Sequence, residues 1–579
     1  MIAHARPLAE RLAAASDAEL TELFRAREVR TDAGFTDFFD VAESLLDPAS
    51  VQRALPRLTG DEAAALHRAA SESDAGTDAE TDAAAHRDAL IRLALLQADG
   101  TPYPSVTTAV LDRAAPVRPE PTPPLPSSDE AAAHAAERAL TTIDAVAGLV
   151  LHASEKPLTL LSGGAVGAGE KKMLAEQGVP VDTVDHLVAL AVDAQLATRD
   201  GRVLCTTAAA AQWLICSAAD RWSALVQGLR DALPRGIRTP SGGWTPPASW
   251  PHAYPWDSGW PGRCRALHER TRLLALIADD DSEPSWAAAI RAGALPDATE
   301  LMALLPAEVD RIFLQNDLTA ISPGPLAPAL DIRLRAIAER ESAAQASSYR
   351  FTAESIAHAL IMGETERSII DFLEALSLTG IPQTLRYLIA QTAQRHGLVR
   401  VSTDAETGRT RIESVDHHLI QAMHIDQALR PLGLSLQHGS LTTRVNRDTV
   451  YCALTDARYP ATIVDEDGQA TAGERHPLAS TYSAERSCAH TGYESLVAAL
   501  RAHQGPDADA AWLDRELDAA VRAKAVLKVA VGLPDGSTRE LIIQATGLGG
   551  GRLRGRDRTA DVERTLPVSS IRSATVIAE

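Results

Sequence analysis

The sequence predicts a multi-domain, mainly helical protein with additional α+β parts. The chain has 579 residues, which exceeds what one hydrophobic core can organise, so we expect about three to five domains. Apolar residues make up 45% and charged residues 23% of the chain, a profile typical of soluble globular proteins. Alanine is abundant and aromatic residues reach only 4%, so cores built from Ala, Leu, Val and Ile favour helices.

Composition and charge also narrow the function classes. The N-terminus "MIAHARPLAERLAAASDAEL" lacks an apolar signal region, and no stretch has the roughly 18 apolar residues of a membrane span. We therefore expect a cytoplasmic protein, with association to the nucleoid as an alternative, and no membrane partner. The five cysteines form no CxxC pair, which predicts neither a disulfide framework nor a zinc knuckle. The net charge of -21 repels polyanions, so any DNA contact requires a local basic face.

The first domain, residues 1–114, carries helical periodicity, and we interpret it as a helical, winged-helix-like unit. Ser16 or Asp17 is a plausible N-cap for "SDAELTELFRAR". The acidic segment 71–84 predicts a solvated loop. Residues 115–130, "APVRPEPTPPLPSSDE", are dense in proline and predict a semi-rigid linker.

Residues 131–235 predict a winged-helix domain. Three helical segments are followed by "TRDGRVLCT", in which Asp200 and Gly201 are typical of a two-residue hairpin turn. The second helix and the hairpin carry basic side chains that could contact DNA. These candidates are Lys171, Lys172, Arg199 and Arg202.

The stretch "LTLLSGGAVGAGEKKML", residues 158–174, is laid out like a phosphate-binding P-loop. Gly164 and Gly169 have the required spacing, but Glu170 stands where the motif needs lysine, and Met173 follows the two lysines. A carboxylate at a helix N-terminus repels phosphate. We therefore favour a structural loop before a helix, with a degenerate nucleotide site as the alternative, and predict no cofactor.

Residues 236–305 contain a loop rich in proline, glycine and tryptophan, followed by helices. Aromatic rings in such a loop can stack on bases or grip a partner protein, or pack over a neighbouring core, which is the more common arrangement. The candidate partner-binding residues are Trp244, Trp250, Trp256 and Trp260.

Residues 306–410 predict an α+β module. "RIFLQNDLTAI" reads as one buried strand before the Pro323–Gly324 turn, and "SYRFTAESI" as a short strand with Thr352 capping the next helix. Leu376, Leu385, Leu388 and Ile389 line apolar helix faces, and Gly397 ends a helix before the strand "LVRVS".

This module, with "FLQNDLT" and "IPQTLRYLIAQTAQRHG", resembles the N-terminal domain of XPB-type DNA helicases. The wider layout resembles actinobacterial helicase-associated proteins that lack a motor. The resemblance implies a DNA-associated or regulatory role. Unwinding cannot be carried over, because no GxxxxGK[ST] or acidic helicase box follows residue 402.

Residues 411–500 read as a mixed α/β segment. Asp416, His417, His418 and His424 could suggest a metal, but their spacing puts no convincing ligand set on one helical face. The same holds for Cys488 and His490. We therefore predict no metal site and a partly exposed polar helix.

Residues 515–579 alternate apolar and polar residues around glycine turns, which predicts a small twisted sheet or β-barrel. This part resembles the small barrel of WYL-type regulatory proteins, although the Trp-Tyr-Leu signature is absent. In an extended strand the arginines of "RLRGRDR" project from one side and could contact phosphates, or could protect a solvated edge strand. They are Arg552, Arg554, Arg556 and Arg558.

Together these features predict a non-enzymatic, DNA-associated accessory or regulatory protein whose partners are DNA and a helicase or DNA-repair protein. The sequence contains no GxSxG motif, no HExxH motif and no Ser-His-Asp constellation, so we do not expect an independent hydrolase. The alternative is a protein-interaction scaffold that docks through the tryptophan loop without touching DNA, which the acidic balance favours.

Overall fold

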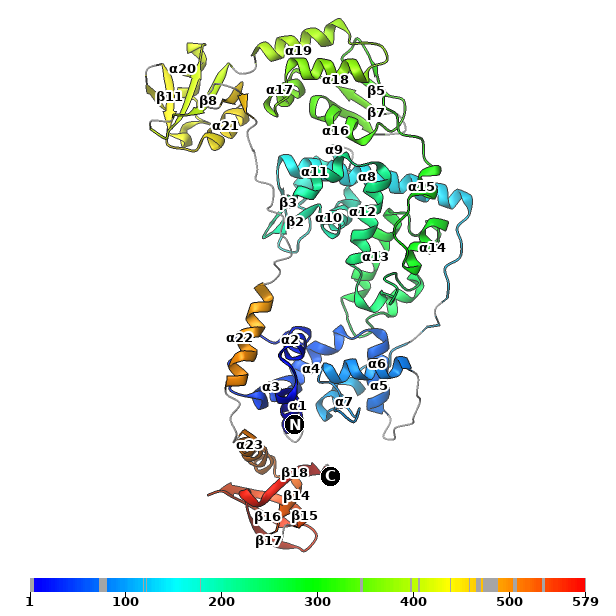
Figure 1. Cartoon of the computed structure of the whole chain (residues 1–579), viewed down its shortest axis with the longest axis vertical. Helices are drawn as coiled ribbons and strands as arrows, with labels where there is room; N and C mark the ends of the chain where they lie inside the picture. The colour runs from blue at the N-terminus through cyan, green and yellow to red at the C-terminus, as the bar shows by residue number, and fades with distance from the viewer. Residues whose placement is uncertain are drawn as a thin grey trace.

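The computed structural model describes residues 5–71, 81–117, 119–120, 122–176, 179–343, 347–395, 398–404, 407–437, 439–457, 459–464, 470–471, 488–502, 508–533 and 537–577. Helices outweigh strands, at 52% against 19%, as the alanine-rich composition predicts. Five separate buried clusters divide the chain into packed units. Figure 1 shows these units arranged along an elongated molecule.

The N-terminal unit is helical. Ser16 caps α2 in a capping box with Glu19, which confirms the first of the two predicted cap residues. The only strand-like pairing in the described part of this unit is the isolated bridge between Leu96 and Pro102. Its helices are α1 (Ala5–Ala14), α2 (Asp17–Ala26), α3 (Phe38–Leu46), α4 (Pro48–Ala54), α5 (Gly60–Ser71), α6 (Thr81–Arg92) and α7 (Pro104–Leu111).

The second unit contains the predicted three helices and hairpin, followed by further helices. Its strands pair antiparallel in the order β1-β3-β2. The elements are α8 (Asp129–Glu155), β1 (Leu158–Thr159), α9 (Ala168–Glu176), α10 (Val184–Asp193), β2 (Ala197–Asp200), β3 (Val203–Thr206), α11 (Ala208–Ile215), α12 (Ala218–Asp231), α13 (Trp260–Leu273), α14 (Ser285–Ala292) and α15 (Thr299–Ala303).

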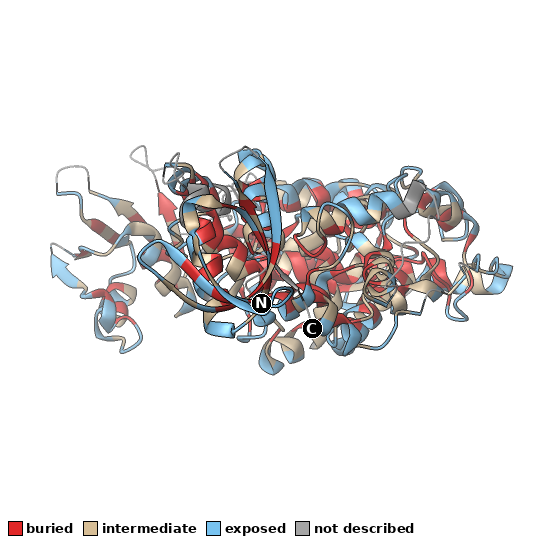
Figure 2. Cartoon of the chain, turned by 90° about the horizontal axis from the view of Figure 1, so that it is seen from below, coloured by how far each residue is buried: buried red, intermediate tan, exposed pale blue. Residues whose placement is uncertain are grey.

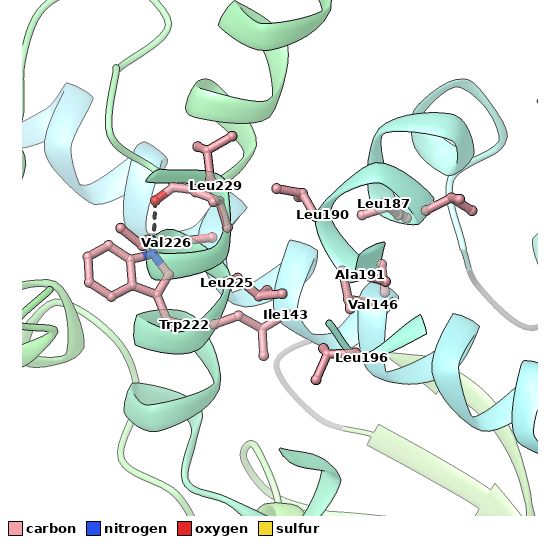
Figure 3. Close-up of a cluster of buried hydrophobic side chains, with 14 of the residues drawn as sticks. Ile143, Val146, Leu187, Leu190, Ala191, Leu196, Trp222, Leu225, Val226 and Leu229 are labelled. Atoms are coloured by element: carbon pink, nitrogen blue, oxygen red, sulfur yellow. Dashed lines mark hydrogen bonds between the residues drawn. The ribbon is translucent and has the colours of Figure 1, made fainter. Parts of the chain in front are cut away.

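A single core joins the hairpin-bearing part of the second unit to its later helices. Leucines of α10 and α12 interdigitate with Ile143 and Val146 of α8 (Figure 3). The Trp222 indole N–H donates to the Leu274 carbonyl over 2.9 Å, so the large ring is buried with its polar atom satisfied. The extra helices are therefore part of the same packed body.

The third unit is α+β, with a sheet in the order β4-β5-β7-β6. The prediction of a single strand in "RIFLQNDLTAI" is wrong. It breaks into two, because Asp317 accepts hydrogen bonds from Thr319 and Leu318 takes a φ of 65°, which turns the chain back. The elements are β4 (Phe313–Leu314), β5 (Thr319–Ser322), α16 (Pro328–Ile337), β6 (Glu339–Ala343), β7 (Ser347–Arg350), α17 (Ala353–Ile361), α18 (Glu366–Leu376) and α19 (Gln383–Arg395).

The predicted cap and apolar faces of the third unit are confirmed. Thr352 caps α17 in a capping box with Ser355. Leu376, Leu385 and Ile389 are buried, and Leu388 is partly buried against the same core. Gly397 lies outside the described residues.

The fourth unit starts earlier than the sequence suggests. β8, which was expected to close the third unit, pairs instead with β9 and β12, so the boundary lies near residue 397 rather than 410. The sheet order is β10-β11-β9-β8-β12-β13. Its elements are β8 (Val399–Thr403), β9 (Thr410–Ser414), α20 (His417–Ile425), β10 (Ser435–Gln437), β11 (Ser440–Thr443), α21 (Arg447–Asp456), β12 (Ala461–Val464) and β13 (Ala470–Thr471).

The chain then returns to the N-terminal unit, which the sequence does not predict. Helix α22 (Cys488–Ala502), assigned above to the 411–500 segment, packs its apolar face into the N-terminal core through Tyr493, Leu496 and Leu500. Figure 1 shows α22 beside the N-terminal helices and far from the fourth unit. Helix α23 (Ala508–Ala523) follows and links this core to the C-terminal sheet.

The C-terminal unit is an open sheet and not the closed barrel that was predicted. Its order is β17-β16-β15-β14-β18, and no described strand pair joins the two edges. One face packs on α23 through Leu513 and Leu517, so the helix covers the apolar side that barrel closure would otherwise bury. Figure 2 shows how far each described residue is buried. The strands are β14 (Val526–Gly532), β15 (Thr538–Gly549), β16 (Arg552–Asp557), β17 (Val562–Pro567) and β18 (Ile571–Ile577).

Candidate nucleic-acid interface

The C-terminal sheet displays the predicted row of arginines. Along β16, exposed and buried residues alternate strictly, so Arg552, Arg554 and Arg556 lie on the outer face. Gly555 lies on the inner face, where an added Cβ would lie 2.5 Å from the Gln544 carbonyl oxygen. Arg558 follows the strand and is also exposed. The one-sided display is observed for the three arginines of β16. We call these three together with the exposed Arg558 the arginine row, residues 552, 554, 556 and 558.

The four guanidinium groups of the arginine row differ in their partners. Arg556 donates to Asp561 over 2.8 Å, an ion pair in which both side chains are more than half exposed. Neither Arg552 nor Arg554 has a side-chain partner among the described residues. Since an exposed ion pair is weak, Arg556 can exchange its partner for a phosphate, and the guanidinium groups of Arg552 and Arg554 are already free.

A buried carboxylate fixes the C-terminal end of β16. Asp557 is 2% exposed, accepts from Arg564 over 2.6 Å and caps the turn through the backbone N–H groups of Thr559 and Ala560. The Arg564 hydrogen bond, followed by the backbone bonds, lowers the pKa of Asp557. This anchor holds the register of the strand that carries the arginine row.

The hairpin of the second unit provides a smaller basic patch. Asp200 pairs with Val203, so the two loop residues are Gly201 and Arg202 rather than Asp200 and Gly201. Gly201 has a φ of 58°, which a tight hairpin loop requires. The side chains of Arg199 and Arg202 are exposed on this hairpin. Two of the four predicted residues of this unit are therefore brought together.

The lysines of α9 lie on a different element and have unequal surroundings. The Lys171 ammonium donates to Asp185 over 2.6 Å, and only Lys172 is exposed. Burial tends to raise the pKa of Asp185, but hydrogen bonds from Lys171 and from the Val166 amide lower it overall. The charge of Lys171 is therefore compensated within the fold.

The glycine loop that resembles a P-loop uses its own backbone donors. Gly164 donates to the Leu161 carbonyl and Leu161 donates to the Ala165 carbonyl, both over 2.8 Å. The Val166 N–H donates to Asp185 over 2.9 Å. A phosphate cradle needs such N–H groups free, so this geometry fits the structural alternative.

In the winged helix that the sequence predicts, α10 would be the DNA-reading helix, but in this structure it is covered. None of its ten residues is exposed, and its leucines pack on α12 in the core of Figure 3. Gly228 of α12 lies so close that an added Cβ would be 2.5 Å from the Ala194 Cα. Asp193 is paired with Arg270 of α13 over 2.5 Å. The helix cannot enter a major groove in this structure, a restriction that the sequence does not reveal.

The four candidate tryptophans are buried rather than displayed. Trp244, Trp250 and Trp260 belong to the core of the second unit, and Trp256 belongs to the N-terminal core. The Trp256 indole N–H donates to the Ala114 carbonyl over 3.0 Å. The core-packing alternative describes these rings, and in this conformation they offer no surface to a partner.

The tryptophan stretch instead joins the first two units. Arg235 forms a bidentate ion pair with the buried Glu62, with N–O distances of 2.7 and 2.8 Å. The Gly60 N–H donates to the Ala253 carbonyl over 2.8 Å. The residues that make these contacts are far apart in the sequence, so no local sequence pattern predicts them.

The histidines considered for metal binding lie on or next to one helix. Asp416 is the N-cap of α20, accepting from the His418 N–H over 2.9 Å, and His417 and His424 lie on the same helix. Within the part of the chain that is described, no group of three or more His, Cys, Asp or Glu side chains is placed to hold a metal. Helix α22 begins at Cys488, and the side chains of residues 488–492 lie outside the description.

A family model described as helicase conserved C-terminal domain matches residues 312–438. The matched range covers the third unit and about half of the fourth, about a fifth of the chain. No curated protein matches the chain. Among the described helices, none combines the length and apolar character that a membrane crossing requires. The family match supports a helicase-related protein.

Proposed function

We propose that the chain is a DNA-associated accessory or regulatory protein that acts without ATP hydrolysis of its own. The third unit would be an XPB N-terminal-like module, the second a winged helix, and the C-terminal sheet a WYL-like unit. The partners would be DNA and a helicase or repair protein. The observation that carries the proposal is the arginine row, in which three exposed arginines share one face of β16 and the exposed Arg558 follows, in a chain with a net charge of -21.

The chemistry of this face suits phosphate. Arginine donates to phosphate oxygens without sequence preference, and spacing along one strand follows a backbone rather than base edges. The covered helix α10 removes the usual route to base reading in a winged helix. We therefore expect binding without strong sequence specificity, supported by the hairpin arginines Arg199 and Arg202.

The test is fluorescence anisotropy with labelled single-stranded, duplex and forked DNA across a salt series. Replacing Arg552 and Arg554 with alanine should reduce the slope of log K against log salt by about 2, at about 0.9 for each phosphate contact. A matched control removes two exposed arginines elsewhere, Arg53 and Arg68. Unchanged affinity and slope in the first variant, or an equal loss in the control, would refute the assignment.

A scaffold without DNA contact is the second candidate, favoured by the net charge of -21. Because the tryptophan rings are buried, docking would have to use another surface. The third unit exposes Leu378 and Tyr387, at 56% and 67%, and apolar exposure of this kind suits a protein contact. Nuclease-resistant recovery of a helicase partner that is lost in Tyr387→Ala would favour this candidate, and nuclease-sensitive recovery would exclude it.

A further inference from the structure

A cavity of about 900 Å³ lies between the N-terminal and second units. Its walls come from α1, α2, the segment after α4 and the end of α6 on one side. On the other side they come from residues 234–263. Its volume falls in the range of small-molecule sites, which also occur preferentially between domains.

The cavity lining is positively charged, in contrast to the whole chain. It contains six arginines and three acidic residues. Three of the arginines are paired with carboxylates: Arg57 with Glu28, Arg235 with Glu62, and Arg263 with Asp257. The other three, which we call the unpaired arginines, have no carboxylate partner among the described residues. They are Arg11, Arg27 and Arg92.

Arg27 is the most constrained of the unpaired arginines. It is 5% exposed and donates to the Leu93 and Leu45 carbonyls over 2.8 and 2.6 Å, and to the Ser50 hydroxyl. Its Nε has no partner. Burial lowers the pKa of Arg27 to about 10, so the group stays charged at neutral pH. A buried cation without a counter-ion is costly, and an anion beside it would relieve that cost.

Arg11 adds a second positive charge to the cavity lining. Its only described hydrogen bond is to the Leu96 carbonyl over 3.3 Å, and burial lowers its pKa. Arg92, at the end of α6, is exposed and has no hydrogen-bond or ion-pair partner among the residues that the structure describes. An anion that entered the cavity would meet free guanidinium N–H groups of these two side chains.

The remaining wall is apolar. Leucines from α1, α2 and the segment after α4 line it together with Trp260. Apolar walls with a few convergent polar groups are typical of organic-ligand sites. They favour a ligand with a hydrophobic body over a bare inorganic ion.

We propose that this cavity binds an amphipathic organic anion. Its oxyanion group would contact Arg11 and Arg92 beside the buried charge of Arg27, and its apolar body would pack on the leucines. Because the two sides of the cavity belong to different units, the bound anion would hold the N-terminal unit against the second unit. The inference is independent of DNA binding by the arginine row.

The probe for the test is 1-anilinonaphthalene-8-sulfonate, an aromatic sulfonate whose fluorescence rises in an apolar site. The purified full-length chain should bind it saturably. Octanoate should displace it, whereas octanol at the same concentration should displace much less, because only octanoate can pair with arginine. Equal displacement by both would overturn the proposal.

Variants locate the site. Arg11→Gln with Arg92→Gln should weaken probe binding by about tenfold, as expected for loss of a charge-assisted hydrogen bond. Ala89→Phe, which adds volume to the α6 wall without changing charge, should also weaken it. Arg367→Gln with Arg430→Gln, two exposed arginines on the third and fourth units, is the matched control.

The outcomes are distinct. Probe binding that is unchanged in both the arginine pair and Ala89→Phe would overturn the proposal. Binding that falls in the variants but resists octanoate would also overturn it, because the site would then not select for an oxyanion. Circular dichroism of each variant separates loss of the site from loss of the fold.

Discussion

Glu516 in α23 is a buried carboxyl whose ionisation should weaken the contact between the C-terminal helix and the N-terminal unit. The residue is 3% exposed, and its Oε2 has no hydrogen-bond partner. Burial raises the pKa of Glu516 to about 7, with Arg6 lowering it and Glu10 raising it, both from α1. The substitution Glu516→Gln keeps the shape and removes the charge.

The magnitude follows from the shift. A pKa raised from 4.5 to about 7 means that the folded state binds more protons than the unfolded state between these pH values. Stability is therefore full below pH 4.5 and declines as pH rises through 7. At about 1.4 kcal/mol for each unit, the wild type should lose about 3 kcal/mol by pH 8. Glu516→Gln should recover this amount at pH 8 and show no advantage below pH 4.5.

Hydrogen exchange by mass spectrometry is the assay, because a multi-domain chain does not unfold in one step. Amides of α23 in Glu516→Gln should be about a hundredfold better protected than wild type at pH 8 and equally protected near pH 4.5. Glu494→Gln, an exposed carboxyl on α22, is the control and should change neither. Equal protection of the wild type and Glu516→Gln at pH 8 would refute the reasoning.

Three further predictions test how the units are held together. Trp512→Ala removes a ring that is 2% exposed, so it should lower the free energy of unfolding by about 3–5 kcal/mol. Hydrogen exchange should rise throughout α22 and α23. Unchanged exchange would contradict this prediction. Gly228→Ala places a Cβ 2.5 Å from the Ala194 Cα, so overpacking should cost about 1–3 kcal/mol in urea unfolding of the second unit, and wild-type stability would show that α12 adjusts freely. Lys171→Ala should leave the salt slope of DNA binding unchanged, because Asp185 already compensates this charge; a slope reduced by about 1 would show a phosphate contact instead.

The features that the sequence predicted well are local ones. The cap at Ser16 and the capping box at Thr352 each depend on residues three positions apart. The arginine row depends on the two-residue period of a strand. Each of these features could be predicted because the contacts that determine it lie within or next to one helix or strand.

The features that were missed depend on distant contacts. The Tyr493 hydroxyl donates to the Val29 carbonyl over 2.8 Å, and Arg515 pairs with Asp37 and Asp40, although these partners are more than 460 positions apart. The expected single strand at 311–321 failed for a different reason: a short turn at Leu318, which has a φ of 65°, divides the segment into two strands.

The sequence by itself determined the helical character and the basic strand near the C-terminus, because composition and periodicity act within a few residues. Only the tertiary structure decided which of the candidate surfaces are open. Helix α12 packs on α10 and covers it, and all four candidate tryptophans are buried in the cores of the first two units. Helix α23 covers one face of the C-terminal sheet, so the sheet stays open. Burial depends on which apolar faces find each other across the whole chain, and hydrophobic contact is not directional enough for a local pattern to encode that choice.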